Sequence, residues 1–369
     1  METPIITAII LSAGLSSRMG DFKPLLSLEG KFFLERAIAL YHSAGIQDIR
    51  VVAGHRAGDV MALAERCGAR AVFNPDFAHG MFSSVVAGIS DISQDCAGFF
   101  IHPVDIPLVR CQTLIDLQNA FKHGKASIYY PTFLEERGHP PLISGIHIRA
   151  IKTWTVQGGL QGFLNGYEAD AINVPVVDRF ILNDIDTPKD YVWALGCMDH
   201  YDIPSDAECR ALMIRKAVSQ KVIDHCRAVA DLAKHIATAL NTAGCQLNIE
   251  RTVSAALVHD LARGRPHHAA EGANILREME FFSIADIVEV HMDYTVNKEA
   301  PITEAEVVFL ADKWIQEDQK INMEERFQAK LQKYGADSGV RLGILRCRDN
   351  ALEAQNRVEA IMGCTIHEL

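Results

Sequence analysis

The chain has 369 residues, more than one hydrophobic core usually organises, so two domains are expected. Hydrophobic residues make up 49% and charged residues 22% of the chain, which is typical of a soluble globular protein. The 47 acidic residues outnumber the 36 basic ones and give a formal net charge of -11. This balance argues against a nucleic-acid partner and against an anionic membrane, because both require a basic surface.

An apolar run over residues 5–11 opens the chain. No basic segment precedes it and it is too short to cross a membrane, so we predict a buried first strand. The nine cysteines are scattered without a C-x-x-C pair, as expected of free thiols in a reducing compartment. The sequence therefore predicts a cytoplasmic protein.

Up to about residue 195, short β-rich runs alternate with helical periods such as 33–44 and 83–89, as in βαβ units. The β-rich runs contain Ile, Val and Phe without clean alternation, which predicts a mostly parallel sheet buried on both faces. The predicted strands are 5–11, 48–52, 71–73, 98–102, 127–130 and 174–177.

The pattern changes after Trp193. We predict a first domain over residues 1–198, a linker over 199–212 and a second domain over 213–369. In the second domain, apolar residues recur at spacings of three and four, which predicts an all-α fold. The predicted helices are 221–240, 250–262, 268–278, 284–292 and 303–315, and a Thr303–Glu306 capping box starts the last of them. Residues 321–369 are expected to add helices to this core.

A loop of small residues, 12–20, follows the first predicted strand. Its backbone N–H groups would bind a nucleotide phosphate, and Arg18 and Lys23 would add positive charge there. The spacing is neither that of a Walker A loop nor that of a dinucleotide-binding loop. Considered alone, the loop is explained equally well as a turn that needs glycine.

Two acidic turns favour the interpretation of the 12–20 loop as part of a nucleotide site over its interpretation as a simple turn. Asp105 follows the predicted strand 98–102, and the carboxyl end of a central strand is where open α/β sheets bind ligands. A carboxylate there would hold Mg²⁺ against the phosphates of an NTP. The second turn contains Asp184 and Asp186, although Asp186 or Thr187 is also suited to cap the following helix.

These motifs, in this order, resemble the nucleotidyltransferases that attach CMP or GMP to molybdopterin, and most closely the molybdenum cofactor cytidylyltransferases. The resemblance implies a Rossmann-like α/β fold of the nucleotide-diphospho-sugar transferase type. It also implies Mg²⁺-dependent transfer of CMP from CTP, or from another NTP, to molybdopterin. The matching segments are 11–20 with Lys23, 74–76, 80–84, Asp105, 137–140, 158–159 and 184–190.

The resemblance assigns roles to the matching residues. Arg18, Lys23 and Asp105 would be catalytic, Asp105 and Asp186 would bind Mg²⁺, and a strand at Gly138-His139-Pro140 would receive the acceptor. The nucleotide would be bound by Ser12, Ala13, Gly14, Ser16, Arg18, Lys23, Ser83, Ser84 and Asp105.

Two segments depart from the family pattern. Pro103-Val104 precedes Asp105 where the family usually has a Cys or a similar residue, and residues 158–162 lack the expected acidic and Arg side chains. Related enzymes that act on sugar phosphates and alcohol phosphates share the first loop. A small phosphorylated alcohol or sugar therefore stays as an alternative acceptor.

Several ionisable residues stand out on successive predicted helices of the second domain. A single His on an apolar helix face is usually structural, and His267 beside His268 shows how such residues arise by chance. As a set, however, they lie toward a core where unpaired charges are unfavourable, and a shared metal would remove that penalty. The set consists of His225, His259, Asp260, His268, His291 and Asp312.

The order His, His-Asp, His, His, Asp resembles the HD superfamily of metal-dependent phosphohydrolases. The resemblance implies one or two divalent metals, Fe or Mn, which would activate a water and bind a phosphate oxygen. It places His225, His259, Asp260 and Asp312 at one metal and His268 and His291 at a second, with Asp260 bridging and catalytic. Lys313 and Arg263 are suited to contact a phosphate, but we interpret them as solvated helix charges. A regulatory domain that senses a nucleotide is the alternative for this half.

Overall fold

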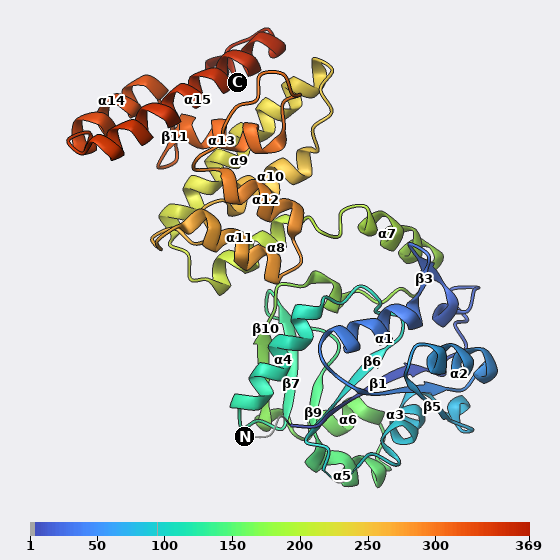
Figure 1. Cartoon of the computed structure of the whole chain (residues 1–369). Coiled ribbons are helices and arrows are strands. Elements are labelled where there is room, and N and C mark those ends of the chain that lie inside the picture. The colour runs from blue at the N-terminus through green and yellow to red at the C-terminus, as the bar shows by residue number, and fades with distance from the viewer. Residues whose placement is uncertain (1–3, 94) are drawn as a thin grey trace. The chain divides into compact units, whose positions relative to one another are not determined.

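The computed structural model describes residues 4–93 and 95–369 and divides the chain into two compact units, one up to His200 and one from Tyr201 (Figure 1). The predicted linker over residues 199–212 is wrong in its second half. Residues Asp206–Arg215 form helix α8, which begins at a capping box between Ser205 and Glu208 and buries Leu212 completely. The apolar positions of this helix belong to the core of the second unit.

The first unit is built on a mostly parallel sheet with helices on both faces, as predicted (Figure 1). Its strand order is β10-β7-β9-β6-β1-β4-β5, with β8 paired to β7. The short strand β9 runs antiparallel between β6 and β7 and was not predicted, because three residues give no recognisable period. The strands are β1 Ile6–Ser12, β4 Asp48–Ala53, β5 Arg70–Phe73, β6 Gly98–Pro103, β7 Ile128–Phe133, β8 Glu136–Arg137, β9 Leu142–Ser144 and β10 Ala171–Pro175.

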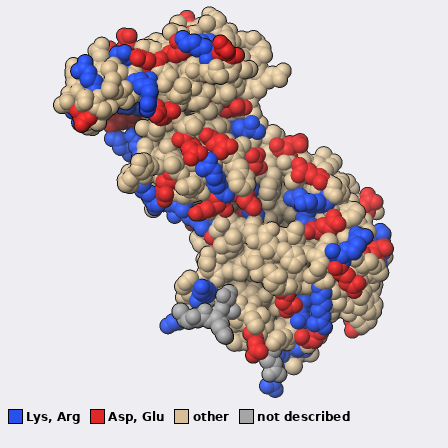
Figure 2. Space-filling view, viewed as in Figure 1, with Lys and Arg blue, Asp and Glu red and all other residues tan. Residues whose placement is uncertain are grey.

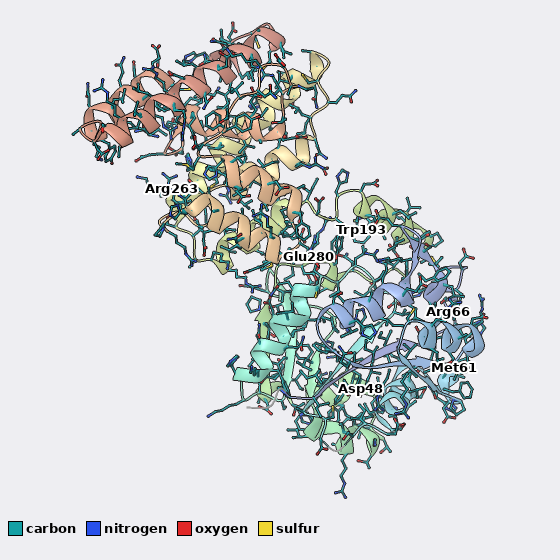
Figure 3. All side chains as sticks on the ribbon, in the orientation of Figure 1. Asp48, Met61, Arg66, Trp193, Arg263 and Glu280 are labelled. Carbon is teal, nitrogen blue, oxygen red and sulfur yellow. The ribbon has the colours of Figure 1, made fainter. Side chains whose placement is uncertain are left out.

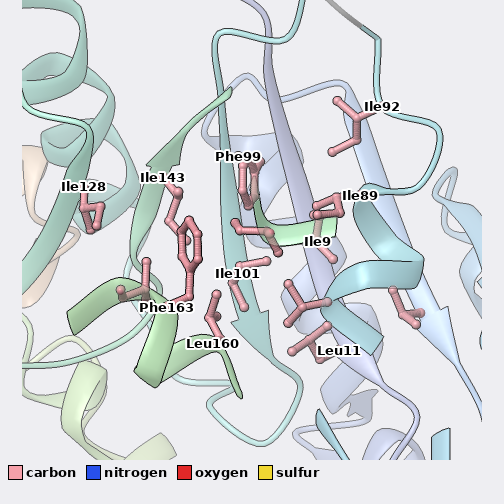
Figure 4. Close-up of a cluster of buried hydrophobic side chains, with 14 of the residues drawn as sticks. Ile9, Leu11, Ile89, Ile92, Phe99, Ile101, Ile128, Ile143, Leu160 and Phe163 are labelled. Carbon is pink, nitrogen blue, oxygen red and sulfur yellow. The ribbon is translucent and has the colours of Figure 1, made fainter. Parts of the chain in front are cut away.

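Burial on both faces of the sheet explains the continuous apolar runs. Every residue of β1 is buried. On one face, Ile9, Phe99 and Ile101 pack against Ile89 of α3 and Phe163 of α6 (Figure 4). The helices of this unit are α1 Phe33–Ser43, α2 Ala57–Arg66, α3 Met81–Ile89, α4 Cys111–His123, α5 Ile148–Lys152, α6 Gly159–Asn165 and α7 Pro188–Met198, and β2 Ser27–Leu28 pairs with β3 Lys31–Phe32. The carboxyl ends of β1 and β6 lie side by side, because these two strands pair in parallel.

The second unit is helical, as predicted, apart from one small hairpin of β11 Ile315–Gln316 and β12 Gln319–Lys320. Thr303 accepts a hydrogen bond from the Glu306 N–H and caps α13, whereas the Glu306 carboxylate pairs with Arg357. The helices are α8 Asp206–Arg215, α9 Gln220–Thr242, α10 Ile249–Val258, α11 His268–Glu278, α12 Phe282–Val290, α13 Glu304–Trp314, α14 Met323–Tyr334 and α15 Ser338–Met362. The expected extra helices after residue 321 are thus α14 and α15, which pack together (Figure 1).

Acidic and basic side chains are interspersed over the face that Figure 2 shows. All nine cysteines are free thiols. Within residues 4–93 and 95–369, none of the helices combines the length and the apolar character that a bilayer crossing requires.

His102, at the end of β6, is fully buried beneath the Asp105 turn. Its Nδ1 lies 3.1 Å from the Tyr41 hydroxyl and its Nε2 lies 3.0 Å from the Ile106 carbonyl oxygen. Burial lowers the pKa of His102 to about 4. The folded protein therefore holds this ring neutral at pH values where the unfolded chain binds a proton.

We predict that His102 makes the first unit less stable as the pH falls from 6.5 toward 4. Over this range the free energy of unfolding should decrease by up to about 1.4 kcal/mol per pH unit from this group alone. In His102→Gln this contribution disappears, so urea unfolding between pH 7 and 5 should show a smaller pH slope than in the wild type. Equal slopes in the two proteins would contradict the prediction.

Candidate active sites

The loop after β1 lines a pocket of about 380 Å³ at the carboxyl edge of the sheet. The loop is fixed by the Ser16 hydroxyl, which accepts a hydrogen bond from the Lys23 N–H at 3.1 Å, and by the Ala13 carbonyl, which accepts one from the His55 N–H. The structure brings seven of the nine predicted nucleotide-binding residues to this pocket. They are Ser12, Ala13, Gly14, Ser16, Lys23, Ser84 and Asp105.

Ser83 and Ser84 have different surroundings although they are neighbours on α3. The Asn74 side-chain amide donates to both hydroxyls, at 2.9 and 3.0 Å. Ser83 in turn donates to the carbonyl oxygens of Asp76 and Gly80 and stabilises that turn. Only Ser84 of the two is among the residues that line the pocket.

A second pocket of about 380 Å³ lies on the other side of Asp105. The two pockets share Met81, Pro103 and Asp105. The second one is lined by Arg18 and by the predicted acceptor residues Gly138 and His139, whereas Pro140 is outside the lining. Asp105 thus stands between two cavities, and each is large enough for a small ligand.

The segment Gly138-His139-Pro140 is irregular backbone with a cis His139–Pro140 bond, so its assignment as a strand is wrong. It follows β8 and is held by a hydrogen bond from the His139 N–H to the Ile181 carbonyl. A Cβ at residue 138 would overlap that same carbonyl group, so only glycine fits there. Burial lowers the pKa of His139, although Asp105 and Asp184 oppose this effect.

Charged side chains from three segments meet at the junction of the pockets. Lys23 is 7% exposed, and its ammonium lies 2.8 Å from an Asp105 oxygen and also pairs with Asp186. Arg18 Nη1 lies 2.7 Å from the other Asp186 oxygen. The Ile185 N–H donates to the Asp105 carbonyl, which joins the two acidic turns. Sequence analysis had not given Asp184 a role, but it is the third carboxylate here and also lines the second pocket.

The surplus of carboxylates suits a hard divalent cation. Burial raises the pKa of Asp184, and the charge of Asp186 beside it raises that pKa further. Such crowding of carboxylates is relieved by an added positive charge, and oxygen is the ligand that Mg²⁺ prefers. The residues present therefore fit a Mg²⁺ ion held by Asp105 and Asp186.

In the second unit, the structure brings all six predicted metal ligands together. Asp260 is central: its Oδ2 lies 3.7 Å from His225 Nε2 and 3.5 Å from His259 Nε2. Its Oδ1 lies 3.3 Å from His268 Nε2 and 3.7 Å from His291 Nε2. The two oxygens of one carboxylate thus face two separate groups of imidazoles.

Asp312 completes the first of these groups. Its Oδ1 lies 3.2 Å from His225 Nε2 and 3.8 Å from His259 Nε2. Burial opposes its ionisation, but Lys313 and then His225 hold the pKa of this carboxyl well below its usual range.

Backbone carbonyls fix the orientation of three of the imidazoles. The Nδ1 atoms of His225, His259 and His291 lie 2.7, 2.8 and 2.6 Å from the carbonyl oxygens of Glu317, Ala256 and Val288. Each Nδ1 therefore carries the proton, and each Nε2 presents a lone pair to the centre. These Nε2 atoms are buried and form no well-aligned hydrogen bond with any described residue, as expected of metal ligands.

Electrostatics keep the cluster in the ligating state. Burial lowers the pKa of His259 to about 4, so this ring is neutral at physiological pH. Burial opposes ionisation of Asp260, but the neighbouring His259, His268 and His291 hold the pKa of its carboxyl well below its usual range. Neutral imidazoles with ionised carboxylates fit Fe, Mn and several other divalent ions.

The interpretation of Lys313 as a solvated charge is wrong. Its side chain is 2% exposed, and its Nζ donates to Asp312 Oδ2 at 2.6 Å and to the His291 carbonyl oxygen at 3.0 Å. Arg263 is half exposed and pairs with Asp260 from the loop after α10 (Figure 3).

Arg326 of α14 was missed entirely by the sequence analysis. Its Nη1 donates to the carbonyl oxygens of Asp312, Lys313 and Ile315 at 2.5, 2.9 and 2.7 Å. These carbonyls lie at the end of α13 and directly after it, where the Asp312 carbonyl also accepts the Ile315 N–H, so Arg326 helps to fix the backbone of Asp312.

The α/β unit with its loop of small residues after β1 and the helical unit with its six-residue His/Asp cluster are together the features of an enzyme. The sequence matches the MobA-like NTP transferase domain over residues 8–171 and the HD domain over residues 222–314. The chain belongs to the MobA-like nucleotidyltransferases and carries an HD domain in its C-terminal half. Dependence on divalent metals is typical of both kinds of domain.

Two relatives and one solved structure are similar to parts of this chain. The molybdenum cofactor cytidylyltransferase of Escherichia coli is 30% identical over 193 residues, which cover 51% of this chain and 95% of that enzyme. An uncharacterised protein of Methanocaldococcus jannaschii, MJ0778, is 37% identical over 98 residues, which are 25% of this chain and 58% of that protein. The solved structure of Rv0371c from Mycobacterium tuberculosis has 22% identity and a TM-score of 0.46, and the match covers 53% of this chain and all of that one.

We predict that Lys23→Ala destabilises the first unit when metal is absent, because Asp105 and Asp186 lose their shared cation. With EDTA the variant should melt several degrees below the wild type, and Mg²⁺ should raise its melting temperature more than that of the wild type. Lys31→Ala, at an exposed lysine in β3, serves as the matched control. Equal responses of both variants to Mg²⁺ would contradict the prediction.

We predict that His259→Ala and Asp260→Ala lower the metal content of the purified chain by at least one equivalent. The reason is that His259 belongs to one imidazole group and Asp260 faces both groups. Elemental analysis after dialysis against Mn²⁺ or Fe²⁺ measures this loss. His267→Ala removes an exposed imidazole next to the cluster and should keep the wild-type content. Unchanged metal in the first two variants would show that neither residue is a ligand.

Proposed function

We propose that the chain is a bifunctional enzyme whose first unit transfers CMP from CTP to molybdopterin, or to the molybdenum cofactor, with release of pyrophosphate. The observation that supports this most is the position of Asp105 between two pockets of similar size. One pocket has the phosphate-binding type of loop and the other has Gly138 and His139. A donor in the first pocket and an acceptor in the second would meet at the carboxylates.

In this reaction a phosphate oxygen of the acceptor attacks the α-phosphorus of CTP. A new P–O bond forms, and the bond to the bridging β-phosphate oxygen breaks, so pyrophosphate leaves with the electron pair. Mg²⁺, when held by Asp105 and Asp186, supplies positive charge to the triphosphate. No protein nucleophile is needed, so positioning and electrostatic stabilisation provide the rate enhancement.

Lys23 and Arg18 have a two-state role in this scheme. Without nucleotide they neutralise Asp105 and Asp186. Asp105 and Asp186 would hold the cation that accompanies the triphosphate, and Lys23 and Arg18 would then be free to pair with the leaving phosphates. The roles of Ser12 to Ser16 and of Ser84 follow from the same pocket: the loop surrounds the phosphates and α3 lies near the base or sugar.

For the HD domain we propose metal-dependent hydrolysis of a nucleotide or another phosphate ester. Support comes from the meeting of all six predicted His and Asp residues, three of which have a buried Nε2 without a hydrogen-bond partner among the described residues, since a domain that only senses a nucleotide does not need to preserve both imidazole groups. The metals, when bound, would lower the pKa of a water and hold a phosphate oxygen. The free cysteines favour a cytoplasmic location for both activities.

The decisive experiment measures pyrophosphate and phosphate release by the metal-replete full chain with each NTP and a panel of phosphorylated acceptors. We expect pyrophosphate release that is selective for CTP, requires molybdopterin and falls at least a hundredfold in Asp105→Ala. Phosphate release by the HD domain should survive Asp105→Ala and be lost in Asp260→Ala.

Each other outcome changes a defined part of the proposal. CTP-dependent release with a sugar phosphate or alcohol phosphate, but not with molybdopterin, would replace the acceptor. Absence of phosphate release with an intact metal site would favour the nucleotide-sensing role of the HD domain.

A further inference from the structure

The second unit contains a pocket of about 400 Å³ that is separate from the His/Asp cluster. Residues of α8, α9 and α10 line it, and none of the six cluster residues is among the described residues of this lining. A cavity of this size is large enough for a small organic ligand. Neither the transfer reaction nor the hydrolysis proposed above uses it.

The pocket and the cluster lie on opposite faces of the two helices that they share. On α9 the pocket is lined by Ile223 and Arg227, and His225 lies between these two residues in the chain. Two residues along an α-helix correspond to a rotation of about 200°, so His225 points away from the pocket. The same spacing separates Leu257, which lines the pocket, from His259. A ligand in the pocket would therefore not contact the cluster.

One side of the pocket is apolar and has a fixed position. Cys209 and Met213 of α8 are 2% and 4% exposed. The Ser254 hydroxyl donates to the Pro204 carbonyl oxygen at 2.7 Å, which holds the start of α8 on α10. The Val218 N–H donates to the Met213 carbonyl oxygen at 3.0 Å, which holds the turn into α9. The pocket thus presents an ordered apolar surface to the body of a ligand.

Two guanidinium groups line the same pocket without an acceptor. Arg210 and Arg227 form no hydrogen bond or ion pair with any residue in the part of the chain that the structure describes. Asp206 is the one carboxylate among the described residues of the lining, so the lining has a net positive charge. In a chain with a net charge of -11 this is a local exception, and it favours an anionic ligand.

We propose that this pocket binds a small organic anion that carries two negative charges and an apolar body, at a site distinct from both active centres. The charges would pair with Arg210 and Arg227, because the planar donor groups of arginine match carboxylate and phosphate oxygens. The body would lie against the apolar side of the pocket. A phosphate monoester and a dicarboxylate both have this chemistry.

The test measures binding of (1-naphthylmethyl)phosphonate, a fluorescent probe that resembles a phosphate monoester and cannot be hydrolysed, to the metal-replete full chain. The double variant Arg210→Gln/Arg227→Gln removes both guanidinium groups. Lys216→Gln/Lys234→Gln is the matched control, since it removes the same charge next to α8 and on α9 but outside the lining. We expect one site to bind the probe at least tenfold more weakly in the arginine variant and unchanged in the control.

Three further probes define the ligand. Uncharged 1-naphthol and orthophosphate should each bind at least tenfold more weakly than the phosphonate, because each lacks one of the two recognised parts. Tighter binding of the phosphonate than of naphthalene-1,8-dicarboxylate would identify a phosphate monoester as the ligand, and the reverse order would identify a dicarboxylate.

The variants also separate this pocket from the two active centres. All of them keep the transferase pockets and the His/Asp cluster, so binding at those places is common to them. Asp260→Ala should leave the affinity of this site unchanged, and its loss in that variant would place the probe at the cluster and overturn the proposal. Equal affinities in the arginine variant and the lysine control, with both proteins folded by circular dichroism, would also overturn it, as would absence of binding to the wild type.

Discussion

Neutralisation of buried carboxylates is the constraint on which both centres depend. A carboxylate removed from water is unfavourable unless a cation or several donors compensate it. In the α/β unit, where the two carboxylates are half-buried, the compensation comes from the Lys23 ammonium shared by Asp105 and Asp186 and from Arg18 on Asp186. In the helical unit it is a shell of imidazoles with Lys313. Both arrangements hold ionised oxygens in a fixed position, which is the requirement for binding a metal ion.

The helical unit uses its helix ends to satisfy this constraint. His259 and His291 occupy the positions that end α10 and α12, and each Nδ1 hydrogen-bonds the carbonyl three residues earlier. One hydrogen bond thus engages a carbonyl in the last turn of the helix and also selects the tautomer that turns Nε2 inward.

Much of this arrangement follows from the sequence, because its signals are local. The continuous apolar run of β1 predicts a strand buried on both faces, and the spacing around Val229 and Ile236 predicts the stripe of α9. The convergence of His225, His259 and His291 also follows, since an ionisable residue on each apolar helix face requires a partner in the core. The sequence allowed either Asp186 or Thr187 to cap α7, and the structure has Thr187 as the cap.

The rest depends on contacts between residues far apart in the chain. The strand β9 has three residues and is defined by its pairing with β6 and β7. The sequence of α8 resembles a linker because it contains several polar residues and follows Pro204. Its apolar face becomes evident only in the structure, where the helix is packed. Lys313 would be solvated on an isolated helix, and it is buried because α12 presents the carbonyl of His291 to it. Asp312 and Lys313 are neighbours in the sequence, and this adjacency could have predicted that they form an ion pair.

The three hydrogen bonds from Arg326 to the end of α13 have a consequence for where the catalytic domain ends. Residues 222–314 contain all six side chains of the His/Asp cluster, but a polypeptide cut at Trp314 would lack the guanidinium that anchors Asp312 and the Glu317 carbonyl that orients His225. The segment that matches the HD domain thus holds the clustered His and Asp side chains, whereas the contacts that position these side chains extend into α14. Substitutions at Arg326 or at the Glu317 turn are therefore expected to disturb the His/Asp cluster, although neither residue belongs to it.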